Sequence, residues 1–258
     1  MRNGALWKKK EKACTDEEKE DHGDQWDHAV VDAESKAVIS MVCGKRTKEN
    51  TEELIQDFAS RCNDGSPPEL FTTDNYPCYQ DALLHAYGKW VVPERTGKLG
   101  RPKNPFQTEP DMQYATVTKK RQSGEVVSID MRQVYGTGDA LEAALGSSSV
   151  SNAVNTSFVE RYNGTDRHLN ARKARKTLEF SKDCEYHVCH SWLCVAYYNF
   201  CWDHRSLRVE TGDREYAHRS PMMALGVTDH IWSVEKLATY QTIAGHQAKK
   251  GSYTFTGP

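Results

Sequence analysis

Apolar residues gather in two short stretches early in the chain, Ala29–Val31 and Ala37–Cys43, with a polar segment at Asp32–Lys36 between them. Both stretches are rich in β-forming residues, which is typical of strands joined by a turn. They therefore predict a β-hairpin. Apolar residues then recur with helical spacing over Lys48–Cys62, and the preceding Thr47 is a favourable N-cap, so a helix is predicted there.

The next apolar stretch, Glu69–Thr73, has the length of a strand and leads directly into Asp74, and a helical pattern follows over Tyr79–Tyr87. The order hairpin, helix, strand, helix predicts an α/β layer structure. Two longer stretches, Gln113–Lys119 and Glu125–Val134, then alternate in the manner of strands around a turn.

The second half of the chain favours helices. A short one is predicted near Asp139–Leu145, a charged one within Thr156–Lys176, a long apolar one over Cys184–Asp203 and a last one over Ser233–Tyr240. Residues 93–111 (PERTGKLGRPKNPFQTEPD) are rich in Pro, Gly and cations and predict an exposed connector. The tail from residue 241 onwards is expected to be frayed.

Composition narrows the class of protein. The 258 residues carry a net charge of −2, so any surface that attracts nucleic acid must be local. Mean hydropathy is −0.76, and no apolar run approaches the roughly 18 residues of a membrane span. The N-terminal residues lack the apolar segment of a signal peptide. We therefore expect a cytoplasmic protein without a membrane partner, whose eight cysteines are free thiols.

The long apolar helix raises the question of a metal site. In helical register His187, His190 and Cys194 lie near one face, which is compatible with zinc. However, the region has no C-x-x-C pair, and large apolar residues interleave with the histidines and cysteines. A buried helix that uses cysteine as a small hydrophobic residue is favoured.

The segment Thr156–Lys176 combines a carboxylate with a basic run. Glu160 and Arg167 are seven residues apart and would share one face of a helix. Four more cations follow, namely Arg172, Lys173, Arg175 and Lys176. A carboxylate that can hold a metal, beside cations that can bind phosphates, indicates chemistry on a nucleic-acid backbone. The alternative is a solvated amphipathic helix with ordinary surface charge.

Asp74 is the natural partner for Glu160. Two-metal phosphoryl transfer needs carboxylates that converge on the ions, and Mg²⁺ prefers hard oxygen ligands. A strand end is a suitable platform, because the backbone fixes the carboxylate while the site stays open. The alternative reading of Asp74 is a helix cap or turn former in the sequence T-D-N-Y-P.

Four blocks in order carry a resemblance to a known family: TTDNYPCYQDAL, NTSFVERYNGTDRHLNARKARKTLEFSKD, YYNFCWDHRSLR and SPMMALGVTDHIWS. They resemble bacterial insertion-sequence transposases of the DDE type, over about Gly23–Leu237. The resemblance implies a ribonuclease H-like α/β fold, with a mixed sheet flanked by helices. It also implies that Asp74 and Glu160 are the second and third acidic residues of the triad, and that Arg167 contacts DNA near the cut.

The resemblance fails at the N-terminus. In such transposases the first acidic residue lies on the first strand, in a D-E-x-W-type motif some ten residues before a lysine-rich run. That run is Lys9–Lys12 here, and no Asp or Glu precedes Glu11. Asp32 is a doubtful substitute, because it falls in the turn between the second and third strands. The chain therefore resembles a transposase that is truncated at its N-terminus, through a truncated gene or a start codon assigned too late.

These patterns predict a charged N-terminal remnant over residues 1–22, a catalytic domain over 23–204 and a C-terminal tail with one short helix over 205–258. The expected activity is Mg²⁺- or Mn²⁺-dependent cleavage and strand transfer at transposon ends and target DNA. We expect a homo-oligomer when active, associated with the nucleoid when bound to DNA, and impaired by the missing acidic residue. The alternatives are a catalytically inactive DNA-binding remnant and a ribonuclease H-like nuclease unrelated to transposition.

Overall fold

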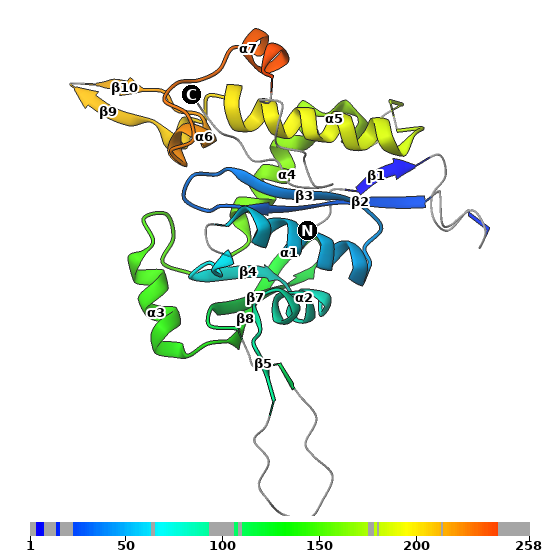
Figure 1. Ribbon diagram of the computed structural model, residues 1–258, viewed down its shortest axis with the longest axis vertical. Coiled ribbons are helices and arrows are strands. Elements are labelled where there is room, and N and C mark those ends of the chain that lie inside the picture. The colour runs from blue at the N-terminus through cyan, green and yellow to red at the C-terminus, as the bar shows by residue number, and fades with distance from the viewer. Residues whose placement is uncertain are drawn as a thin grey trace, which may run out of the picture. The chain divides into compact units, whose positions relative to one another are not determined.

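The computed structural model forms two compact units. One contains residues 1–46 and 157–258, and the other contains residues 47–156. Figure 1 shows the helices and strands. The structure describes residues 4–7, 14–15, 23–62, 65–92, 106–107, 110–174, 178–179, 181–212 and 214–241.

The first unit is built on a three-stranded antiparallel sheet. Its strands are β1 (Gly4–Trp7), β2 (Gly23–Val31) and β3 (Val38–Gly44), in the order β1-β2-β3. The predicted hairpin is confirmed as β2 and β3. Its turn is closed by a hydrogen bond from the amide of Asp32 to the carbonyl of Ala37, at 2.9 Å. Strand β1 lies within residues 1–22, for which the sequence predicts a charged remnant.

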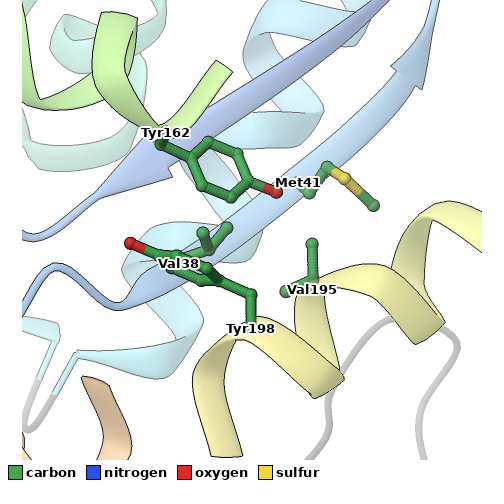
Figure 2. Close-up of a cluster of buried hydrophobic side chains, with 5 residues drawn as sticks. All are labelled: Val38, Met41, Tyr162, Val195 and Tyr198. Atoms are coloured by element: carbon green, nitrogen blue, oxygen red, sulfur yellow. The ribbon is translucent and has the colours of Figure 1, made fainter. Parts of the chain in front are cut away.

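Two helices pack on this sheet. Helix α4 (Ser157–Leu169) contacts β2, and helix α5 (Cys184–Ala196) contacts β3 and α4. A five-residue π-helical stretch, η4 (Tyr197–Cys201), continues α5, where the sequence predicted one uninterrupted helix. Figure 2 shows the core that results, in which side chains from β3, α4, α5 and η4 converge: Val38, Met41, Tyr162, Val195 and Tyr198.

The C-terminal segment belongs to the same unit. Trp232 and Met222 pack with Ala37 and Phe200 in a second apolar cluster, with the rings of Trp232 and Phe200 4.4 Å apart. The described part of the segment that the sequence predicted as a tail therefore contributes to the core of this unit. Residues 242–258 lie outside the described residues. Its elements are η5 (Arg205–Leu207), β9 (Val209–Gly212), β10 (Glu215–Ala217), α6 (Pro221–Ala224) and α7 (Val234–Thr239).

The second unit holds a mixed sheet in the order β4-β7-β8, flanked by helices. Strand β4 runs parallel to β7, and β7 runs antiparallel to β8. Helix α1 contacts α2, α3 contacts β7, and the rings of Phe58 and Phe71 join α1 to β4 at 5.6 Å. The elements are α1 (Lys48–Arg61), β4 (Leu70–Asp74), α2 (Cys78–Tyr87), β5 (Trp90–Val91), β6 (Phe106–Gln107), β7 (Gln113–Gln122), β8 (Glu125–Tyr135) and α3 (Gly138–Ser147).

The predicted fold class is confirmed at the level of a mixed α/β protein with a mixed sheet flanked by helices. Local signals explain why the second unit was predictable. Thr47 caps α1 by accepting a hydrogen bond from the amide of Asn50, and Leu54, Ile55 and Phe58 form its buried face.

Most of the predicted connector over 93–111 lies outside the described residues. Among the described helices, none has the length and apolar character needed to cross a membrane.

Candidate functional site

Asp74 is the last residue of strand β4 and lies opposite Val117 on the parallel strand β7. The N-cap of α2 is Pro77, which makes no side-chain capping bond, so Asp74 is not the capping residue of that helix. The side chain is half-buried at the carboxyl end of a parallel strand, where α/β proteins commonly bind ligands. The predicted position at a strand end is therefore confirmed.

Neighbouring side chains fix the end of β4. The hydroxyl of Thr73 lies 2.9 Å from the hydroxyl of Tyr114 on β7, and Thr72 donates a hydrogen bond to the carbonyl of Asn155. Burial raises the pKa of Tyr114 to about 12, and the negative charge of Asp74 acts in the same direction. Tyr114 therefore stays a neutral hydroxyl at physiological pH and supports the strand end without adding charge.

Glu160 lies in the first turn of α4, in the unit of residues 1–46 and 157–258, and is half-buried. Arg167 lies in the last turn of the same helix and is exposed. The prediction that one helix carries both residues is confirmed. The opposite face of α4 is buried through Tyr162 and Asp166, which have the i, i+4 spacing of a helix face.

The predicted run of cations does not form one surface. Helix α4 ends at Leu169, and the side chain of Asn170 accepts a hydrogen bond from the amide of Arg172 to start the short 3-10 turn η3 (Ala171–Lys173). Arg172 is half-buried, whereas Lys173 is completely buried. Residues 175 and 176, predicted as the DNA contacts Arg175 and Lys176, lie outside the described residues. The prediction of Lys173 as a phosphate contact is wrong for this structure, because its ammonium group is enclosed by carboxylates.

Lys173 forms the centre of a buried charged network. Its Nζ lies 2.8 Å from Oδ2 of Asp27 on β2 and 2.9 Å from Oδ2 of Asp166 on α4. His187 on α5 places Nε2 3.1 Å from Oδ1 of Asp27, and its Nδ1 lies 2.7 Å from the hydroxyl of Ser181. The network therefore ties β2, α4, η3 and α5 together through groups that are almost free of solvent.

The charges of this network explain its pKa values. Burial opposes the ionisation of Asp27, but the hydrogen bond to His187 and the ammonium of Lys173 outweigh it and lower the pKa of Asp27 to about 2. Burial also opposes the charge of Lys173, and the two carboxylates outweigh it and raise its pKa. Burial raises the pKa of Asp166, and the negative charge of Asp27 acts in the same direction, while the ammonium of Lys173 opposes both without outweighing them.

Asp27, His187 and Cys43 also form a group whose possible ligand atoms lie within 4.8 Å of one another. Asp27 already pairs with Lys173 and His187, and the second nitrogen of His187 is used by Ser181. Burial raises the pKa of the Cys43 thiol, which opposes the thiolate that binds a metal. A soft, buried donor set next to an ammonium group does not fit Mg²⁺, which prefers accessible carboxylate oxygens.

The zinc alternative on α5 receives no support from the described residues. His187 faces Asp27, while Cys194 is buried and its Sγ lies 4.0 Å from Nε2 of His190. Cys184 and Cys189 are exposed. The cysteines of this helix therefore do not converge, and Cys194 packs as a small apolar residue.

Asp32 has a local structural role. Its carboxylate accepts a 2.7 Å hydrogen bond from the amide of Ser35 and a second one from the Ser35 hydroxyl. These bonds organise the turn between β2 and β3, in which Lys36 has a positive φ of 62°. The arrangement is that of a turn-forming Asp, which argues against Asp32 as a third catalytic carboxylate. Strand β1, which precedes β2, has the sequence GALW and carries no carboxylate.

The buried network was missed from the sequence, although one signal pointed to it. Asp27 has the same period-two register as Ala29 and Val31, which pack against the core, so it had to face inward. A carboxylate on the inner face of a strand requires a buried counter-charge. Nothing local in the sequence identifies Lys173 as that partner.

Comparisons with known proteins add no family. No protein-family model matches the chain, and neither the curated proteins nor the solved structures contain a match.

Proposed function

We propose that the chain is a ribonuclease H-like catalytic domain of a DDE-type transposase that acts on DNA. The observation that carries the proposal is Asp74, a half-buried carboxylate at the carboxyl end of β4, beside a parallel strand. The order of elements around it also supports the proposal. An antiparallel β2–β3 hairpin precedes α1 and β4, and Glu160 follows on helix α4.

In this proposal Asp74 and Glu160 are the metal ligands. Both are carboxylates on regular elements, which suits Mg²⁺ or Mn²⁺ as a donor set. When bound, the metal would supply an activated oxygen nucleophile and stabilise the leaving oxygen of the cleaved phosphodiester. The chain itself fixes the end of β4, and with it the backbone of Asp74, through the hydrogen bonds of Thr72 with Asn155 and of Thr73 with Tyr114.

The proposed role of the cations is to bind and orient the DNA backbone. Arg167 is exposed on the same helix as Glu160, two turns further on, and Arg172 follows in η3. Arg175 and Lys176 complete the proposed set, whereas Lys173 is left out because it is buried. Phosphate contacts of this kind position the duplex and do not read its sequence. Transposon ends and target DNA are the proposed substrates.

The proposal is tested by nicking of supercoiled plasmid DNA in Mg²⁺ or Mn²⁺. We expect Asp74→Asn and Glu160→Gln each to reduce nicking by at least about a hundredfold, because loss of an outer-shell partner already costs about 10- to 100-fold and loss of a direct ligand costs more. Asp81→Asn and Glu185→Gln are matched controls, because both change exposed carboxylates in the same two units. Nicking that persists unchanged in both Asp74→Asn and Glu160→Gln would contradict the assignment.

A second candidate is a DNA-binding remnant without catalytic activity. It is favoured by strand β1, which lies beside β2 and whose four residues include no carboxylate. Two carboxylates hold a metal pair less well than three. Salt-dependent DNA binding without any metal-dependent nicking by the wild-type chain would support this candidate over the active enzyme.

A further inference from the structure

The β7–β8 hairpin extends beyond the sheet to which it belongs. Strand β4 pairs with β7 only as far as Val117, whereas the β7–β8 pairing continues from there to the turn at Ser123–Gly124. On its other side β8 pairs with no strand in the part of the chain that the structure describes. The distal part of the hairpin is thus a two-stranded ribbon, and such ribbons are marginally stable in water.

The outer strand of this ribbon exposes apolar side chains. Val127, Ile129 and Met131 are 59%, 61% and 55% exposed. Ile129 and Met131 occupy alternate positions in the regular part of the pairing and therefore share one face of the strand, whereas Val127 lies at a shift in the register. Exposed large apolar residues gathered on one short strand are typical of a surface that is covered by another chain.

The same strand has a regular, unprotected edge. Irregularities in the β7–β8 register occur between Tyr114 and Ala115 and between Lys120 and Arg121. Between them Ser128–Gln133 pairs residue by residue with β7. Proteins commonly protect an edge with lysine, proline or a bulge. Strand β8 contains neither lysine nor proline, and Ser128–Gln133 contains no bulge.

We propose that this edge pairs with β8 of a second copy of the chain, in an antiparallel arrangement with a two-fold axis at Met131. In that register Asp130 lies opposite Arg132 of the second copy, and Arg132 lies opposite its Asp130. Met131 lies opposite itself, and Ile129 lies opposite Gln133. Opposite charges therefore meet twice, and the exposed Met131 pairs with an apolar residue.

The surroundings of Asp130 fit this arrangement. Its carboxylate is half-exposed and lies 2.7 Å from Nζ of Lys120 in the same hairpin, so an arginine from a second copy would complete a three-charge cluster. Arg132 is exposed. A DNA partner fits less well, because protein–DNA interfaces are strongly positive and polar, whereas this edge pairs its charges and exposes apolar side chains.

Charge exchange tests the pairing. We expect the 258-residue chain to self-associate in analytical ultracentrifugation. Both Asp130→Arg and Arg132→Asp should weaken the association by about tenfold or more, because each places like charges opposite one another twice. The double variant with both substitutions should restore it. Glu125→Arg is a control, since Glu125 lies outside the paired residues.

A second measurement fixes the register. Oxidation of a Met131→Cys variant should yield a peptide that links residue 131 to residue 131, identified by mass spectrometry against the background of the native cysteines. A chain that remains monomeric up to about 0.1 mM overturns the proposal. It is also overturned if the double variant associates no better than the single variants, or if Arg132→Asp weakens DNA binding and leaves self-association unchanged.

Discussion

Nζ of Lys173 lies 2.8 Å from Oδ2 of Asp27, although the two residues are far apart in the chain and lie on different elements of one unit. Neither side chain is reached by solvent to any extent, and Asp166 completes the ion pair from α4. Removing one member of a buried ion pair leaves an uncompensated charge, which costs far more than the pair itself contributes. Lys173, which the sequence predicted as a DNA contact, therefore stabilises the fold instead.

Replacing Lys173 is therefore expected to destabilise the protein. Lys173→Met leaves two buried carboxylates without their cation and should lower the free energy of unfolding by about 3–5 kcal/mol. Urea denaturation measures the change, with the exposed Lys182→Met as control. If Lys173→Met is as stable as the wild type and binds DNA more weakly, Lys173 is a phosphate contact and not a structural residue.

The two carboxylates around Lys173 should respond differently to neutralisation. Asp27 is stabilised as an anion, so Asp27→Asn should cost about 3 kcal/mol at pH 7. The pKa of Asp166 is raised by burial, so its charge is less favourable, and Asp166→Asn should cost less than Asp27→Asn. Parallel unfolding curves of the two variants test this order. Equal losses would mean that Lys173 compensates both carboxylates to the same extent.

Acid should remove the contribution of Asp27. The pKa of Asp27 is about 2 in the folded protein and below its ordinary value of 3.8, so the ionised group stabilises the fold above pH 4. That contribution, on the order of 2 kcal/mol, is lost as the pH falls from about 4 to about 2. The stability of the wild type should therefore fall more steeply over this range than that of Asp27→Asn. Stability curves with the same slope would contradict the pKa assignment.

Asn199 should be important for the sheet of the first unit. The π-helical stretch places its side chain against β3, where it accepts a 3.0 Å hydrogen bond from the amide of Val38 and donates a 2.9 Å bond to the Val38 carbonyl. Asn199→Ala leaves both buried backbone groups without this partner and should cost about 2–3 kcal/mol. Thermal unfolding measures the loss, and the exposed Asn152→Ala should change stability by less than about 0.5 kcal/mol.

DNA binding should depend on which face of α4 an arginine occupies. If Arg167 contacts a phosphate, Arg167→Ala should weaken DNA binding about fivefold to tenfold and reduce the dependence of affinity on salt by about one ion. Arg161 is also exposed on α4 but is not part of the proposed contact set, so Arg161→Ala is a closely matched control. Fluorescence anisotropy at several salt concentrations gives both quantities. Equal effects of the two substitutions would contradict a specific phosphate contact at Arg167 and would indicate that DNA is attracted by the positive charge of α4 in general.

Local patterns predicted much of the second unit. The spacing of Leu54, Ile55 and Phe58 and the cap at Thr47 are sufficient to define α1, because a helix satisfies its own backbone and buries one face. The β7–β8 hairpin was predictable for a similar reason. Its turn at Ser123–Gly124 requires two residues with positive φ, and the second of them is glycine.

The elements that were missed or altered depend on contacts between distant residues. Strand β1 is only four residues long and is recognisable only through its pairing with β2. Helix α4 ends at Leu169, before the basic run that continues its pattern, and the next turn places Lys173 between Asp27 and Asp166. The long apolar helix changes to π-helical geometry at Tyr197, where Asn199 binds the backbone of β3.

The sequence by itself determined the order of the longer helices and strands, the position of Asp74 at a strand end and the placement of Glu160 and Arg167 on one helix. These features follow from periodicity and capping, which act over a few residues. Only the tertiary structure decided that Lys173 is buried and that Asp27 is its partner. A buried charge is stable only where the fold supplies the opposite charge, and here that charge comes from a strand more than a hundred residues earlier in the chain.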